Sequence, residues 1–308
     1  MNAFSLFIKA FKERNFYILG AGASAKIIPF TSEQGARIVQ RHLDFGMFSL
    51  NPVELNDQAK RIIGSAEDYS QDSFIQELIQ RLPSEAAILI SRQLMTPSLH
   101  LLSQHQPQYS VFNLAPEKSI IFNFNVDGLA HHFCKNHYVL HPHGRLNAEL
   151  HQSKLYNDII DFSLESHKSA APPSSIVMPG PEPTGITKGP EYKKAFESFR
   201  YSRYVIIIGY SFGYDGNKMD DWESFEFLKK IFLYYKVPIF IVDPYPEKLA
   251  YKLRDELKQK NIYEVTADWG ILSKAIIELE KNKTFRNYEK DRKLFDIYYL
   301  YCKLQDDT

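Results

Sequence analysis

The sequence predicts an α/β protein built on a doubly wound, mostly parallel sheet with an inserted helical subdomain. Short runs of β-branched and aromatic residues recur along the chain, and stretches with helical spacing separate them. Most of these runs are continuously apolar rather than alternating, which is typical of parallel strands covered by helices on both faces. The 308 residues suffice for one large domain with a substantial core.

The predicted strands lie at 15–20, 119–124, 138–141, 175–178, 204–209, 237–243 and 262–265. Helical spacing fills much of the long stretch between the first two strands, at 51–66, 70–82 and 83–95. We therefore expect a helical insertion at about 31–115 within a catalytic domain formed by residues 1–280. Residues 281–308 are expected to form a helical extension. The polar segments 151–174 and 179–190 are expected to be loops around a site.

Composition excludes several classes of protein. The 37 basic residues balance the 37 acidic ones, so no whole-protein field would attract nucleic acid or an anionic membrane. With only two cysteines, Cys134 and Cys302, neither a disulfide framework nor a four-cysteine zinc site is expected. No signal-peptide pattern or apolar stretch of about 18 residues occurs, so a cytoplasmic location is expected.

A glycine-containing turn, "GAGAS" (20–24), follows the first predicted strand. Glycines let the backbone turn sharply and approach a pyrophosphate, although glycine turns after strands are also common for structural reasons alone. Ala25 stands where the usual dinucleotide fingerprint has a third glycine, and no acidic residue lies at the ribose-binding distance. A standard hydride-transfer site is therefore a poor fit.

Two polar side chains follow the second predicted strand in "IIFNFNVDGLAHHF" (120–133). Asn125 and Asp127 alternate along an extended segment, so both should point to the same side at the carboxyl edge of the sheet. They could bind a ligand there, or they could bond to nearby backbone groups in a turn.

A histidine pair in "LHPHGRL" (140–146) offers acid–base chemistry. His143 could act as a general base, since imidazole as a group titrates near neutral pH. Together with His141 it could instead bind a metal, but no acidic or thiolate partner completes a familiar spacing. For His131, His132 and His137 we favour a solvated or hydrogen-bonded helix face.

The stretch "VIIIGYSFG" (205–213) contains G-x-S-x-G after a strand, the pattern of a hydrolase nucleophile elbow. That chemistry requires a histidine after the serine, yet all ten histidines lie at or before His167. Ser211 is therefore not expected to be a nucleophile.

In this order, the blocks resemble those of the sirtuin family. "GAGAS" (20–24) matches the sirtuin G-A-G-x-S turn, and "IIPF" (27–30) is a shortened form of the I-P-x-F-R loop that follows it. "FNVDGL" (124–129) matches Q-N-x-D-G-L, with Phe124 in place of glutamine. His143-Gly144 matches the catalytic H-G pair, and Gly209-Tyr210-Ser211 corresponds to the G-T-S turn after a central strand. The resemblance spans roughly residues 15–270.

The resemblance implies a Rossmann-like domain that binds NAD as a substrate and cleaves its nicotinamide–ribose bond, with no metal. Asn125 would position the attacking group, Asp127 would hold the carboxamide, and His143 would take a proton from a ribose hydroxyl or a water. The residues implied to bind the rest of NAD are Gly20, Ala21, Gly22, Ser24, Phe30, Gly209, Ser211 and Asp243.

One departure from the family narrows the expected activity. Protein-deacylating sirtuins carry a four-cysteine zinc module after the histidine, whereas residues 145–174 contain no cysteine. In this respect the chain is similar to sirtuin-like effectors of bacterial antiviral defence, which hydrolyse NAD. Such effectors often act with a second protein such as a HerA-type ATPase, a nuclease or an Argonaute-like protein, so we expect a homo-oligomer, a partner defence protein of this kind, or both. We therefore expect an NAD hydrolase, with deacylation, ADP-ribosyl transfer and a non-catalytic NAD or ADP-ribose sensor as alternatives.

Overall fold

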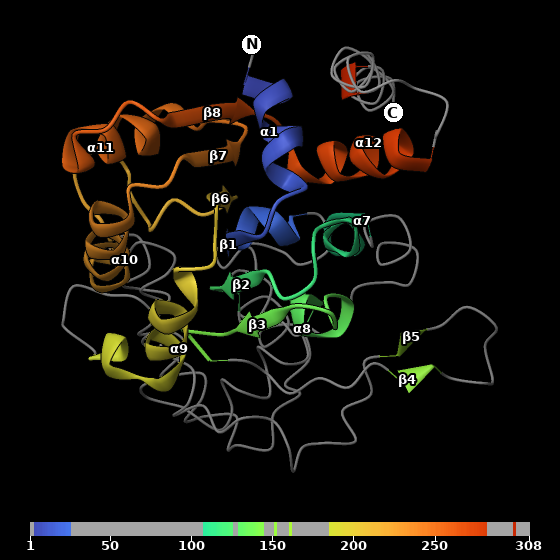
Figure 1. The fold of residues 1–308 in the computed structure, drawn as a ribbon, viewed down its shortest axis with the longest axis horizontal. Coiled ribbons are helices and arrows are strands. Elements are labelled where there is room, and N and C mark those ends of the chain that lie inside the picture. The colour runs from blue at the N-terminus through green and yellow to red at the C-terminus, as the bar shows by residue number, and fades with distance from the viewer. Residues whose placement is uncertain are drawn as a thin grey trace, which may run out of the picture.

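The structure of the protein, a computed structural model, describes seven stretches of the chain (Figure 1). These are residues 3–25, 107–125, 129–144, 151–152, 160–161, 185–281 and 298–299. The predicted helices at 51–66, 70–82 and 83–95 and the predicted strand at 175–178 lie outside the described residues. So do two predicted site residues, Phe30 and Asp127.

A six-stranded, all-parallel sheet forms the centre of the described structure. Its strands are β1 (Asn15–Leu19), β2 (Ile120–Asn123), β3 (Tyr138–Leu140), β6 (Tyr204–Ile208), β7 (Ile239–Asp243) and β8 (Ile262–Thr266). They lie in the order β3-β2-β1-β6-β7-β8. Counted along the chain, this is the doubly wound order of dinucleotide-binding folds, which confirms the predicted α/β class.

Continuous apolar runs became strands buried on both faces. Every residue of β1 and β2 is buried, and so are the last four residues of β6. Along β1, Phe16 and Ile18 face one hydrophobic cluster whereas Tyr17 and Leu19 face the other. Because side chains alternate across a strand, a fully apolar segment needs a helical layer on each side.

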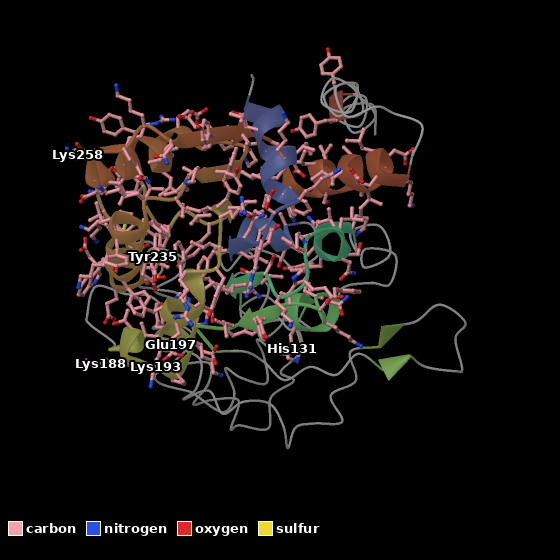
Figure 2. All side chains as sticks on the ribbon, in the orientation of Figure 1. His131, Lys188, Lys193, Glu197, Tyr235 and Lys258 are labelled. Carbon is pink, nitrogen blue, oxygen red and sulfur yellow. The ribbon has the colours of Figure 1, made fainter. Side chains whose placement is uncertain are left out.

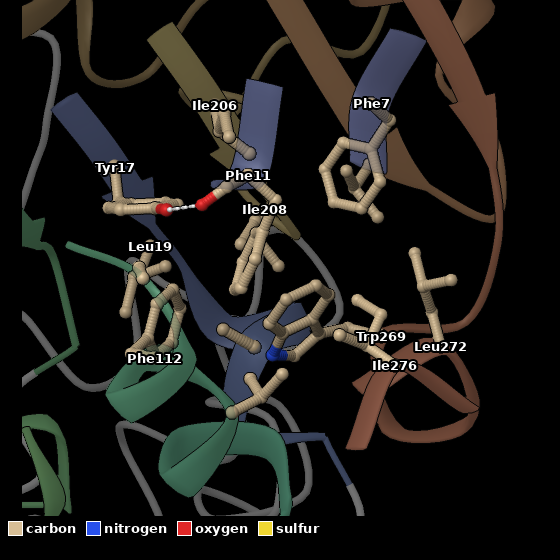
Figure 3. Close-up of a cluster of buried hydrophobic side chains, with 14 of the residues drawn as sticks. Phe7, Phe11, Tyr17, Leu19, Phe112, Ile206, Ile208, Trp269, Leu272 and Ile276 are labelled. Carbon is tan, nitrogen blue, oxygen red and sulfur yellow. Dashed lines mark hydrogen bonds between the residues drawn. The ribbon is translucent and has the colours of Figure 1, made fainter. Parts of the chain in front are cut away.

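Helices supply these two layers (Figure 1). The helices on the face of Tyr17 and Leu19 are α1 (Ala3–Phe11), α7 (Pro107–Ser110), α8 (Leu129–Phe133) and α12 (Trp269–Lys281). The opposite face is covered by α9 (Pro190–Phe199), α10 (Trp222–Tyr235) and α11 (Glu247–Leu257). In the first layer, Phe7 and Phe11 of α1 pack with Trp269 at the start of α12 (Figure 3).

Helix α9 shows how helical spacing sets orientation. Its residues Tyr192, Ala195 and Phe199 follow one another at intervals of three and four, and all are buried. On the same helix, Lys193 and Glu197 are exposed and point away from the sheet (Figure 2). Pro190 occupies the first turn, where its missing N–H costs no hydrogen bond.

Two segments add to the predicted organisation. The range predicted for the insertion ends in α7 and η2 (Val111–Leu114), whose Tyr109 and Phe112 are fully buried in the core beneath the sheet. Within the predicted loop 151–174, β4 (His151–Gln152) and β5 (Ile160–Asp161) form a short antiparallel pair, so this segment is not entirely loop. No helix in the described ranges is long and apolar enough to cross a membrane.

Candidate functional site

The strand order reverses between β1 and β6, and the turns that follow these two strands contact each other. The amide of Gly20 donates to the carbonyl of Ile208 at 3.0 Å, and the amide of Gly22 donates to Gly209 at 3.0 Å. Residues Ala21–Ser24 form η1, a single 3₁₀ turn. In open α/β sheets, the carboxyl edge at such a reversal is where ligands bind.

Close backbone contact explains the glycines of both turns. Gly209 has a φ of +55°, and a Cβ there would lie 2.4 Å from the Cα of Gly22. A Cβ on Gly20 would lie 2.5 Å from the Cβ of Tyr210. The sequence suggested that these glycines admit a pyrophosphate. In the structure, these glycines instead allow the two turns to approach each other closely. The amides of Gly20 and Gly22 already donate hydrogen bonds within the protein.

Asn125 joins the end of β2 to the glycine turn. Its side-chain amide donates to the carbonyl of Gly20 at 2.8 Å and to Oγ of Ser24 at 3.0 Å. Ser24 in turn forms a short hydrogen bond with the hydroxyl of Tyr109 from α7. We call Gly20, Ser24, Tyr109 and Asn125 the Asn125 cluster. Both amide hydrogens of Asn125 are engaged, so the orientation of its carboxamide is fixed and Oδ1 is the acceptor left by these bonds.

His143, after β3, belongs to a second hydrogen-bonded group. Its Nε2 lies 3.1 Å from Oδ2 of Asp221, and both side chains are more than nine-tenths buried. The hydroxyl of Tyr210 donates to the same carboxylate oxygen. We call His143, Asp221 and Tyr210 the His143 cluster. It combines an imidazole with a carboxylate that can orient it, an arrangement that recurs at general bases.

The ring of Phe124 packs against the His143 cluster. Its ring stacks on Tyr210, with centroids 4.2 Å apart and planes 15° apart. It also contacts the imidazole of His143 edge-on, at 4.8 Å and 80°. Phe124 therefore packs against two members of the His143 cluster.

The electrostatics of the His143 cluster favour an ionised carboxylate. Burial alone would raise the pKa of Asp221, but hydrogen bonds from His143, Ser224 and Tyr210 and the charge of His143 outweigh it and lower that pKa. Burial and the neighbouring carboxylate raise the pKa of Tyr210 well above its ordinary value. Tyr210 is therefore a neutral donor, and Asp221 is an anionic acceptor.

The two clusters flank the same chain segment. Asn125 and Phe124 are consecutive; the side chain of Asn125 contacts Ser24, and that of Phe124 contacts His143. Nδ1 of His141 lies 3.4 Å from the carbonyl of Asn125, which links the segments after β2 and β3. No hydrogen bond or ring contact joins the described side chains of Asn125 and His143. The structure thus brings both residues to neighbouring strand ends without direct contact between them.

The remaining predicted binding residues differ in their surroundings. Ala21 and Ser211 are exposed, and Ser211 lies on the turn that contains Gly209. Asp243 ends β7, where Oδ1 accepts the amide of Tyr245 at 2.8 Å. Burial raises the pKa of Asp243. The hydrogen bond from the Tyr245 amide lowers this pKa, and the nearby charge of Glu247 raises it further. The side chain of Asp243 thus forms a hydrogen bond within a local turn.

The histidines do not assemble into a metal site in the described part of the chain. Nε2 of His137 bonds to the carbonyl of Phe112 at 2.8 Å, and burial lowers the pKa of this imidazole. The His131 and His141 rings lie 6.3 Å apart. Among the residues that the structure describes, no group of three histidine, cysteine or carboxylate side chains could hold a metal ion.

Sequence reasoning missed three members of the clusters, namely Tyr109, Tyr210 and Asp221. Asp221 carried a local signal, because it precedes the apolar pattern of α10 and caps that helix by accepting the Ser224 amide at 3.3 Å. Capping alone did not link it to His143. The tyrosines carried no signal that separates them from other buried aromatic residues.

Comparison with known proteins does not assign a family. Neither the models of known protein families nor the curated proteins give a match to this chain. The fold and the site define the class as a doubly wound α/β protein with polar clusters at the switch point of its sheet.

Proposed function

We propose that the protein is a sirtuin-like NAD glycohydrolase, which cleaves NAD to nicotinamide and ADP-ribose. One observation carries this proposal above the others. The glycine turn after β1 and Asn125 after β2 are joined by hydrogen bonds at the switch point of a doubly wound sheet. A nucleotide bound at that edge would lie against residues that the sirtuin resemblance assigns to NAD.

The chemistry needs few groups. The bond between the nicotinamide nitrogen and ribose C1′ breaks, and nicotinamide leaves as a neutral molecule. The transition state is then a cationic sugar, so the protein must position an acceptor and supply one base. In the proposal, Asn125 positions a water at C1′ and His143 takes its proton. The oxygen of that water becomes the anomeric hydroxyl of ADP-ribose.

The geometry supports these roles in two ways. The carboxamide of Asn125 has both hydrogens engaged, which leaves Oδ1 to orient a water or a ribose hydroxyl. His143 has a carboxylate behind it, as bases in hydrolytic sites commonly do. Water is proposed as the acceptor because residues 145–174 lack the cysteines that shape the peptide groove of deacylating sirtuins. A role in antiviral defence, through self-assembly or a partner protein, is proposed on the resemblance alone.

The test is product analysis after incubation of the purified protein, with any partner encoded next to its gene, with NAD. We expect free nicotinamide and ADP-ribose in equal amounts. Asn125→Ala and His143→Ala should each reduce the rate about 100-fold or more. Asn136→Ala, an exposed residue of the turn before β3, is the matched control and should keep full activity.

The outcomes separate the proposal from its alternatives. NAD that stays intact while the protein binds it would favour a sensor. NAD-dependent release of acetate from an acetyl-lysine peptide would favour deacylation, and label transferred from NAD to protein would favour ADP-ribosylation. Hydrolysis that survives His143→Ala at the original rate would rule out His143 as the base.

A further inference from the structure

Asp221 has two carboxylate oxygens with separate tasks. Oδ1 accepts the amide of Ser224 at 3.3 Å and caps α10. Oδ2 faces Nε2 of His143 at 3.1 Å and accepts the hydroxyl of Tyr210. The backbone of Asp221 is held as well, because its amide donates to Phe212 at 3.0 Å. The carboxylate therefore cannot rotate without the loss of its cap.

His143 is the basic side chain that faces the Asp221 carboxylate among the described residues. Groups that face the carboxylate come from three other segments: Tyr210 after β6, Tyr192 on α9 and His143 after β3. Burial and the charge of Asp221 raise the pKa of Tyr192 far above neutral pH, so this hydroxyl is uncharged, as is that of Tyr210. No lysine or arginine pairs with Asp221 among the described residues. An imidazolium formed when His143 takes a proton would therefore lie beside a buried negative charge.

An ionised carboxylate accepts hydrogen bonds and donates none. Nε2 of His143 must therefore carry a hydrogen when it faces Asp221, which leaves the lone pair of the neutral ring on Nδ1. The edge contact with Phe124 holds the plane of the imidazole in addition. Both the tautomer and the orientation of His143 thus follow from its surroundings.

We propose that Asp221 is a positioning residue, which holds His143 with its hydrogen on Nε2 so that Nδ1 is the atom that takes the proton. As the water attacks C1′, one of its O–H bonds breaks and the proton moves to Nδ1, which gives an imidazolium beside the Asp221 carboxylate. The proton then passes to solvent, and the neutral Nε2–H tautomer returns. The catalytic part of this inference rests on the proposed NAD hydrolysis, whereas the tautomer does not.

Asp221→Asn separates positioning from folding. An asparagine is as good a helix cap as an aspartate, so α10 should be retained. To accept the Ser224 amide, the new side chain must place its oxygen at the Oδ1 position, which puts its NH₂ group against His143. The NH₂ donates, so Nε2 must accept and the hydrogen of the ring moves to Nδ1. The nitrogen proposed as the base is then blocked.

The experiment is ¹⁵N NMR of the imidazole in the full chain, above the pH at which the ring is protonated. We expect the Nε2–H tautomer in the unmodified protein and the Nδ1–H tautomer in Asp221→Asn. The neighbouring substitution Asp220→Asn is the matched control and should leave the tautomer unchanged, because Asp220 contacts the turn at Gly213 rather than His143. An Nδ1–H tautomer in the unmodified protein would overturn the proposal, even if Asp221→Asn did not fold.

Kinetics with NAD supply the second measurement. Asp221→Asn should lower kcat about 100-fold or more with little change in KM, since the substitution affects a proton transfer and not binding. An unchanged kcat with a changed tautomer would show that Nδ1 is not the base. An unmodified protein that leaves NAD intact would contradict the proposed function, and the NMR result would still decide the tautomer of His143.

Discussion

The side-chain amide of Asn125 donates a 2.8 Å hydrogen bond to the carbonyl of Gly20, which lies 105 residues earlier in the chain. The same amide bonds to Ser24, whose hydroxyl also bonds to Tyr109. Three segments that are remote in sequence are therefore joined through one serine hydroxyl. The effects of substitutions in the Asn125 cluster on the free energy of unfolding should therefore depend on one another.

The first prediction concerns that interdependence. Asn125→Ala and Tyr109→Phe should each reduce the free energy of unfolding by about 1 kcal/mol per lost hydrogen bond. The double variant should lose less than the sum, by about 0.5 kcal/mol or more, because both residues act on Ser24. Urea denaturation measures all three values.

A matched control lies on the opposite face of the sheet. The hydroxyl of Tyr192 pairs with that of Ser224 at 2.5 Å, away from the Asn125 cluster. Tyr192→Phe combined with Asn125→Ala should give additive losses. Equal coupling in both pairs would contradict the proposed link through Ser24.

The second prediction concerns the contact between the two glycine turns. Gly209→Ala introduces both a positive φ for alanine and a Cβ 2.4 Å from backbone, whereas Gly185→Ala introduces the φ of +69° into open space. A left-handed backbone costs an alanine about 1–2 kcal/mol, and the clash adds about 1–3 kcal/mol more. Thermal or urea unfolding should therefore show the larger loss for Gly209→Ala, and similar losses would mean that the turns do not touch.

The third prediction is the pH dependence contributed by Asp221. Its pKa is lowered in the folded protein, so its ionised form stabilises the fold above about pH 4, the ordinary range of an aspartate. That contribution disappears as the pH falls through the lowered folded-state pKa. The difference in unfolding free energy between the protein and Asp221→Asn should be largest near neutral pH and should shrink on acidification. Denaturation at several pH values between about 3 and 7 measures it, and a constant difference would contradict a lowered pKa of Asp221 in the folded protein.

The fourth prediction concerns Ser211. This residue is exposed, so Ser211→Ala should change the free energy of unfolding by less than about 0.5 kcal/mol. If Ser211 contacts bound NAD, KM should rise with little change in kcat. A complete loss of turnover with an unchanged KM would instead indicate a nucleophilic serine.

The sequence predicted the sheet well because buried parallel strands leave a strong local signal. β1, β2 and β6 each lie within the predicted strand, shorter by one or two residues. The fold class then followed, and with it the expectation that polar residues after the strands share one edge. Asn125, Gly20 and Ser24 do meet there.

The contacts of His143 could not be predicted in the same way. Asp221 was visible in the sequence only as the start of a helix, and Phe124 only as a departure from a motif. Their contact with His143 depends on how the turns after β3 and β6 and the start of α10 come together. The periodicity of a local stretch of sequence carries no information about contacts between segments that are remote in the chain.

The sequence by itself thus determined the α/β class, the positions of the strands and which polar residues stand at their ends, because burial and backbone periodicity act over short stretches of chain. Only the tertiary structure decided which partner each polar group has. It turned the glycines toward each other, bonded Asn125 to Ser24 and placed a buried carboxylate behind His143. Hydrogen bonds and ion pairs depend on distances of about 3 Å, and only the packing of remote segments sets those distances.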